Sequence, residues 1–82
     1  MLNWVIKMYL RIKDIRQDRD LTQKTIAQYL MCDQSLYSKY ERGERELPLH
    51  LAVRLAQFYN VSVDYLVGLT DEEEAYPRHR AK

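Results

Sequence analysis

The side chains best suited to chemistry lie in one stretch, YLMCDQSLYSKYERGER, at residues 29–45. Its cysteine, Cys32, cannot form an internal disulfide, because the chain has no second cysteine. His50 and His79 lie far from Cys32 in sequence and match no usual spacing of metal ligands. We therefore expect no metal site. We interpret Cys32 as a small apolar side chain, with a redox role as the alternative.

The sequence contains no recognisable catalytic motif. It shows no nucleophile paired with a general base, and no glycine-rich loop that could bind phosphate. The tyrosines recur at spacings typical of a packed core, which we favour over a ligand pocket; these are Tyr29, Tyr37, Tyr40, Tyr59 and Tyr65. We expect a protein that is not an enzyme and that uses no cofactor and no small-molecule ligand.

The elements that must position these residues are limited by length and composition. A chain of 82 residues forms one domain, and 46% hydrophobic with 30% charged residues is ordinary for a globular protein. Two glycines and two prolines are few, which favours helices. The apolar start, MLNWVIKMYL, is too short to cross a bilayer and lacks the features of a signal peptide. We expect a cytoplasmic protein without a membrane segment.

Apolar residues at spacings of three and four predict five helices and no strand, so the expected fold class is all-α. The first helix is expected at about residues 9–19, the second over about eight residues after Thr22, and the third at 34–42. The fourth is expected from Pro48 to just before Asn60, with Pro48 in its first turn, and the fifth at 63–67. The expected inward face of the fourth helix is formed by Leu49, Ala52, Val53, Leu55, Ala56, Phe58 and Tyr59.

The second and third helices are separated by a very short turn. Thr22 and Asp33 are expected to cap the starts of these helices, and Gly43 is expected to end the third. Only Met31, Cys32 and Asp33 remain between the helices, so the two must cross at a steep angle. This is the helix-turn-helix arrangement.

Three segments carry a resemblance to a known family: IKDIRQDRDLTQKTIAQYL, SLYSKYERGERELP and LAQFYNVSVDYLVG, in this order. With them the chain resembles the lambda-repressor-like, or Xre-type, helix-turn-helix domains of phage and bacterial repressors. The similarity covers about residues 9–68. It implies a compact five-helix domain that binds double-stranded DNA, usually as a homodimer on a palindromic operator.

The resemblance also implies roles for individual side chains. Base edges in the major groove would be contacted by Gln34, Ser35 and Lys39. The DNA backbone would be contacted by Gln23, Lys24, Ser38, Arg42 and Arg45. Arg16 and Glu41 match a buried ion pair that joins the first helix to the third in relatives. The alternative for each residue is a solvated surface position without a partner.

We divide the chain into an N-terminal apolar extension at residues 1–8, the helix-turn-helix domain at 9–69 and a charged C-terminal tail at 70–82. The extension, with Trp4, packs on the domain, joins a dimer contact or is disordered. Leu69 to Lys82 show no apolar periodicity, so we expect a frayed tail. Met31 stands where relatives often have glycine. If the backbone there is left-handed, a methionine in place of glycine costs about 1 kcal/mol of stability.

The expected function is regulation of transcription by sequence-specific DNA binding, most simply as a dimeric repressor. One alternative is an antitoxin that binds both DNA and a protein toxin. The other is a protein-interaction module without DNA binding, for which the near-neutral net charge of +1 is the support.

Overall fold

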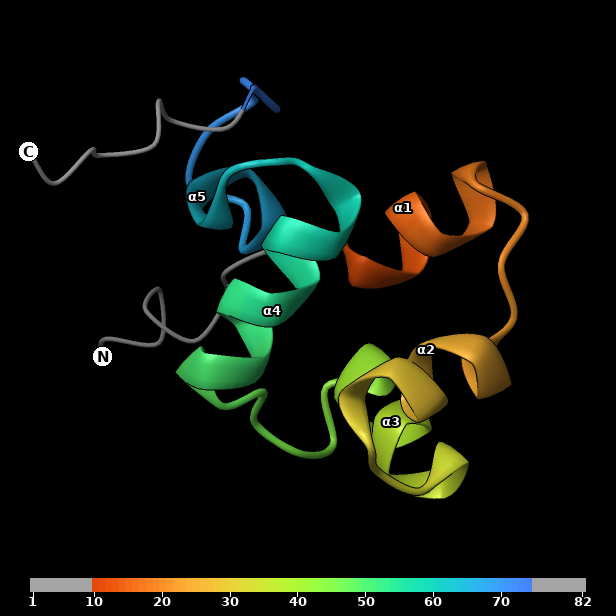
Figure 1. Ribbon diagram of the computed structural model, residues 1–82. Helices are drawn as coiled ribbons and strands as arrows, with labels where there is room; N and C mark the ends of the chain where they lie inside the picture. Colours follow the sequence, from red (N-terminus) through yellow and green to blue (C-terminus); the bar gives the residue numbers. More distant parts are fainter. Residues whose placement is uncertain (1–9, 75–82) are drawn as a thin grey trace, which may run out of the picture.

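The computed structural model describes residues 10–74, and these residues form five helices and no strand (Figure 1). The helices are α1 at Ile12–Asp18, α2 at Gln23–Leu30, α3 at Gln34–Arg42, α4 at Leu49–Tyr59 and α5 at Val63–Leu66. The predicted all-α class with five helices is confirmed. In Figure 1, α2 and α3 lie together on one side of the molecule and α5 lies on the other, with α4 between them. The N-terminal extension at residues 1–8 lies outside the described residues, as does the end of the tail.

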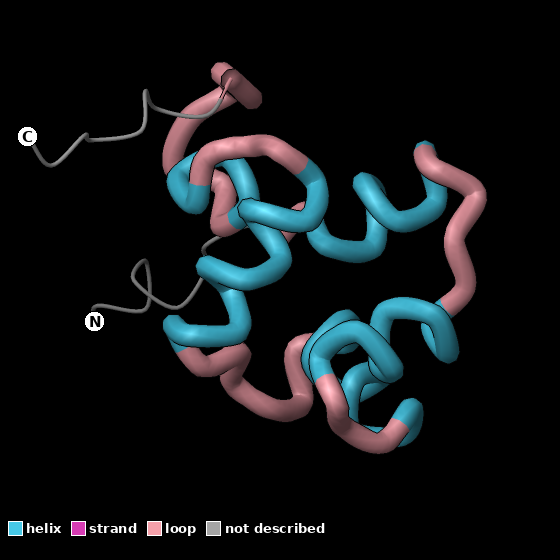
Figure 2. The backbone as a smooth tube through the Cα atoms, viewed as in Figure 1, coloured by secondary structure: helices cyan, strands magenta, loops and turns pink. Residues whose placement is uncertain are grey.

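The link between α2 and α3 is the tight turn expected from the sequence (Figure 2). Thr22 caps α2, because its hydroxyl accepts a hydrogen bond from the backbone N–H of Thr25 at 3.1 Å. Met31 ends α2 in the left-handed conformation, with φ 60° and ψ 45°. Its side chain is 79% exposed, so Met31 occupies the turn without contributing to the core. Cys32 is partly buried against the core, and burial together with Asp33 raises the pKa of its thiol, which fits an apolar role.

Three predicted helix starts need correction. Asp33 stands at the N-cap position of α3, but its side chain accepts no hydrogen bond from the first turn. Pro48 lies one position before α4 with an extended backbone, φ −63° and ψ 148°, and therefore caps the helix instead of joining its first turn. The first helix is also shorter at its start than predicted. The backbone N–H of Arg11 donates to the carbonyl of Leu66 at 2.9 Å, and α1 begins only after it.

The core is formed by residues from all five helices and the linker before α5: Ile12, Ile15, Ile26, Ala27, Leu30, Tyr37, Tyr40, Leu51, Ala52, Leu55, Ala56, Tyr59, Val61 and Leu66. The predicted inward face of α4 is wrong in part. Leu49 is 72% exposed, Phe58 is 40% exposed and Val53 is 37% exposed, whereas Leu51 is buried. The helix is apolar on several sides, so its sequence spacing alone does not select the buried side.

The first residues of the predicted tail are not frayed. Glu74 forms an isolated antiparallel bridge with Val61, and the backbone N–H of Ser62 donates to the carbonyl of Glu73 at 3.1 Å. The guanidinium of Arg11 donates to the carbonyl of Thr70 at 3.0 Å and to the Asp71 carboxylate at 2.9 Å. Residues 70–74 are therefore tied to the domain by backbone and side-chain contacts. None of the described helices is both long enough and apolar enough to span a membrane.

Candidate nucleic-acid interface

The exposed side of α3 carries a row of polar side chains. At 100° per residue, the positions 34, 35, 38, 39 and 42 fall on one side of the helix, and they hold Gln34, Ser35, Ser38, Lys39 and Arg42. Gln34, Ser35 and Lys39 are exposed, and their side chains make no hydrogen bond to any other residue within 10–74. This side of α3 therefore presents an amide, a hydroxyl and an ammonium to solvent.

The opposite side of α3 anchors the helix in the domain. Tyr37 is fully buried and Tyr40 is 5% exposed, while Leu36 packs partly against the core. Burial raises the pKa of Tyr37 strongly, and the nearby Glu41 carboxylate adds to this effect. Tyr37 therefore remains neutral over the physiological pH range, and both rings pack as large apolar groups. Their burial fixes which side of α3 faces outward.

A buried ion pair joins α1 to α3. The Glu41 carboxylate accepts hydrogen bonds from Nε of Arg16 at 2.6 Å and from Nη2 of Arg16 at 3.0 Å. The side chains of Arg16 and Glu41 are only 11% and 2% exposed. Arg16 also donates from Nη1 to the carbonyl of Leu21 at 2.8 Å, in the segment that leads into α2. One guanidinium thus fixes α1, α3 and the start of α2 relative to one another.

Gln23, at the first position of α2, takes part in the same network. Its side-chain amide donates to Oε1 of Glu41 at 3.0 Å. Burial alone would raise the pKa of Glu41, but the hydrogen bonds from Arg16 and Gln23 and the positive charge of Arg16 lower the pKa below its usual value. The carboxylate is therefore ionised at neutral pH and is held by donors from α1 and α2. The resemblance suggested that Gln23 contacts phosphate; the structure adds this internal bond to Glu41.

Three basic residues are expected to contact the DNA backbone: Lys24, Arg42 and Arg45. Lys24 in α2 and Arg45 in the loop after α3 are exposed, and neither side chain has an ion-pair partner within the described residues. Arg42, in the last turn of α3, is different. Its guanidinium donates to both carboxylate oxygens of Glu44, at 2.8 and 3.1 Å, and to the hydroxyl of Ser38. Two expected backbone contacts, Ser38 and Arg42, are therefore bonded to each other.

Sequence reasoning missed Glu44 as a partner of Arg42. The two residues are separated by Gly43, whose backbone is left-handed with φ 76°. This conformation lets the chain turn back on the end of α3, where the backbone N–H of Glu44 donates to the carbonyl of Lys39 at 2.9 Å. The signal for this pair in the sequence is the presence of opposite charges, Arg42 and Glu44, on either side of a glycine that ends a helix.

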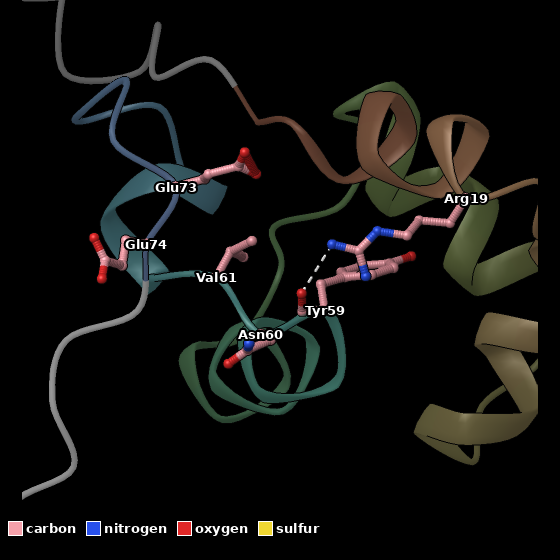
Figure 3. A pocket seen from close by; sticks show the side chains of 6 residues that line it. All are labelled: Arg19, Tyr59, Asn60, Val61, Glu73 and Glu74. Atoms are coloured by element: carbon pink, nitrogen blue, oxygen red, sulfur yellow. Dashed lines mark hydrogen bonds between the residues drawn. The ribbon is translucent and has the colours of Figure 1, made fainter.

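A hollow of about 510 Å³ lies elsewhere on the domain and is lined by Arg19, Tyr59, Asn60, Val61, Glu73 and Glu74 (Figure 3). The guanidinium of Arg19 donates to the carbonyl of Tyr59 at 2.9 Å, and its Cζ lies over the Tyr59 ring, 5.3 Å from the ring centroid. No residue of α2 or α3 lines this hollow. Within the described residues, no group of three or more His, Cys, Asp or Glu side chains could hold a metal ion.

Comparison with known proteins places these features in a family. The helix-turn-helix family matches residues 12–66 of the chain. The uncharacterized HTH-type transcriptional regulator YobD of Bacillus subtilis is 38% identical over 64 residues, which cover 78% of this chain and 57% of that protein. The HTH-type transcriptional regulator ImmR of Bacillus subtilis is 40% identical over 58 residues, which cover 71% of this chain and 46% of ImmR.

A phage protein is also similar. The cryptic phage CTXphi transcriptional repressor RstR of Vibrio cholerae is 35% identical over 58 residues, which cover 71% of this chain and 52% of RstR. The chain spans about half the length of these curated relatives. No solved structure matches the chain. With its matched helices and the short turn between α2 and α3, the chain belongs to the lambda-repressor-like, Xre-type helix-turn-helix family.

Proposed function

We propose that this chain binds double-stranded DNA in a sequence-specific manner and regulates transcription, most simply as a repressor that blocks access of polymerase. The observation that carries the proposal is the row of exposed side chains on α3, Gln34, Ser35 and Lys39, on a helix whose other side is buried. In a helix-turn-helix protein the second helix of the motif enters the major groove. A protein of this kind acts where its DNA lies, in the cytoplasm.

The chemistry of the three side chains suits base edges. A glutamine amide can bond both N6 and N7 of adenine, and a lysine ammonium can bond O6 or N7 of guanine. Ser35 can donate or accept and is therefore less selective. We assign base recognition to Gln34 and Lys39, with Ser35 contacting either a base or a phosphate.

Contacts to phosphate are supported by the surroundings of α3. Lys24 and Arg45 are exposed cations near the two ends of the helix-turn-helix unit in sequence. The first turn of α3 has no side-chain cap, because Asp33 accepts no hydrogen bond there. Its free backbone N–H groups are therefore open to a phosphate oxygen. We propose Lys24, Arg45 and these N–H groups as backbone contacts, with Gln23 and Ser38 beside them.

We further propose that the protein acts as a homodimer on a palindromic site. RstR, a relative over 71% of this chain, is named as a phage transcriptional repressor. Two copies would place their α3 helices about 34 Å apart, one turn of DNA. The symmetry of the bound DNA then reports the symmetry of the protein.

The test is binding of the full chain to duplex DNA across a range of salt concentrations. We expect binding that weakens steeply as KCl rises, because each phosphate contact releases bound cations. We also expect one segment of the DNA upstream of the protein's own gene to compete better than random DNA. Absence of binding, or binding that does not change with salt, would overturn the proposal.

A further inference from the structure

Arg42, in the last turn of α3, has a guanidinium that is bonded to other residues of the domain. Arg42 is on the same side of α3 as Gln34 and Ser38, where a phosphate contact would be expected. Instead its guanidinium forms a two-bond ion pair with Glu44, through Nε at 2.8 Å and Nη2 at 3.1 Å. Its remaining terminal nitrogen, Nη1, donates to the Ser38 hydroxyl. All three nitrogens of the guanidinium are therefore engaged inside the domain.

We infer that Glu44 withholds Arg42 from the DNA backbone and so keeps the sequence-independent affinity of this domain low. The inference rests on the proposed function, because it concerns the same DNA-binding surface. It revises the role that the family resemblance implies for Arg42, from a phosphate contact to a cation neutralised by its neighbour. Glu44 then acts as a determinant of specificity without touching a base.

The backbone presets this pairing. Gly43 adopts φ 76°, and its N–H donates to the carbonyl of Tyr40 at 3.2 Å. The N–H of Glu44 donates to the carbonyl of Lys39 at 2.9 Å, which holds Glu44 against the last turn of α3. The Glu44 carboxylate therefore lies beside Arg42, and its backbone is already held in place by these hydrogen bonds. The planar fork of the guanidinium matches both of its oxygens.

The expected consequence concerns the ratio of specific to nonspecific binding. Contacts to phosphate contribute to binding on every sequence, whereas base contacts discriminate among sequences. An arginine paired to a carboxylate adds no phosphate contact. The pairing therefore lowers the affinity for random DNA and leaves recognition to Gln34 and Lys39.

The experiment compares four variants of the full chain on a labelled 20-base-pair duplex of random sequence, by fluorescence anisotropy over a KCl series. The variants are Glu44→Gln, Glu46→Gln, Arg42→Gln and the double variant of Arg42→Gln with Glu44→Gln. Glu46 is the matched control, since it is exposed in the same loop, carries the same charge and has no ion-pair partner within the described residues. Circular dichroism checks that each variant keeps its helices.

We expect Glu44→Gln to bind about three- to tenfold more tightly than the wild-type chain, with a log-log salt slope steeper by about 0.9, the value for one added phosphate contact. Glu46→Gln should keep the wild-type slope. Arg42→Gln should change little by itself, but it should abolish the gain of Glu44→Gln in the double variant. If the two substitutions are non-additive in this way, the tighter binding of Glu44→Gln comes from the release of Arg42.

Two results would overturn the inference. One is a Glu44→Gln variant that matches Glu46→Gln in both affinity and slope, and the other is a gain that survives in the double variant. Either result leaves the proposed function intact, because the wild-type chain still binds DNA with a salt dependence. A wild-type chain that does not bind the duplex at any salt concentration overturns the proposed function and this inference together.

Discussion

The Glu41 carboxylate accepts two hydrogen bonds from the guanidinium of Arg16, at 2.6 and 3.0 Å, in a site where both side chains are almost fully buried. Arg16 belongs to α1 and Glu41 to α3, so the pair fixes the helix proposed to read DNA to the rest of the domain. Gln23 adds a donor from α2 to the same carboxylate. The orientation of α3 thus depends on one charged network as well as on its buried tyrosines.

Replacement of Arg16 by alanine is expected to destabilise the domain by about 3–5 kcal/mol, because it leaves the Glu41 carboxylate buried without its main partner. Urea unfolding followed by circular dichroism measures the change. Arg42→Ala is the matched control. It breaks an arginine–glutamate pair that is exposed, with 51% and 54% of the two side chains accessible, and should change stability little. Equal effects of the two substitutions would contradict the assigned role of Arg16.

The stability of the domain is expected to fall in acid through Glu41. Its pKa in the folded chain is lowered from the usual 4.5, so the unfolded chain takes up this proton at higher pH than the folded one. The stabilisation is present above about pH 4.5 and is lost as the pH falls through the lower folded value. Glu41→Gln should be less stable than wild type at pH 7 and should show a flatter dependence between pH 5 and pH 3, in urea titrations at each pH. Parallel curves for the two proteins would contradict this.

The turn between α2 and α3 is expected to gain stability from Met31→Gly. Met31 has φ 60°, a conformation that costs a residue with a side chain about 1 kcal/mol, and its side chain is 79% exposed. Glycine removes the strain and loses no packing, but it adds freedom to the unfolded chain. The net gain should be roughly 0.5 kcal/mol, seen as a higher thermal midpoint.

Gly43→Ala is expected to destabilise the domain, because it places a side chain on a left-handed residue, the reverse of Met31→Gly. Gly43 has φ 76°, and a Cβ added there would meet no atom within 4 Å. The substitution therefore introduces backbone strain without a clash, and it should destabilise by about 1–2 kcal/mol. A rise in stability for Gly43→Ala, or a loss for Met31→Gly, would contradict the left-handed assignments.

Replacement of Arg45 by alanine is expected to weaken binding to operator and random DNA by the same factor. Arg45 is exposed in the loop after α3, beyond the helix that carries the positions proposed to reach base edges. Loss of one phosphate contact should also reduce the log-log salt slope by about 0.9. Anisotropy titrations on both duplexes give the two values. A loss confined to the operator would instead make Arg45 a base contact.

The bounds of α3 were predictable because its signals are local. Asp33 is a residue typical of helix starts and Gly43 can adopt the left-handed conformation, so the predicted range and the observed Gln34–Arg42 coincide. The buried side of α4 was predicted only in part. Leu49 and Leu51 are both apolar, and their burial is decided by which side of α4 meets the other helices, a tertiary effect that spacing does not contain.

The candidate site, like the helices, could be predicted only in part from the sequence. The exposed row on α3 follows from helical periodicity, and the family resemblance gave it a role. The bonds that restrain Gln23 and Arg42 were not predictable, since they depend on where Glu41 and Glu44 place their carboxylates after folding. The return of residues 70–74 to the domain was missed for a related reason. It relies on backbone groups and on Arg11, which leave no apolar pattern in the sequence.

The most direct test of base recognition by α3 is selection of bound duplexes from a random pool, performed in parallel with the wild-type chain and Lys39→Ala. We expect the wild-type chain to enrich a palindromic sequence. We expect Lys39→Ala still to bind DNA but to lose preference at one position in each half-site, because Lys39 is exposed and contributes nothing to the core. Enrichment of the same sequence with the same strength by both proteins, or of no sequence by the wild-type chain, would contradict base recognition by α3.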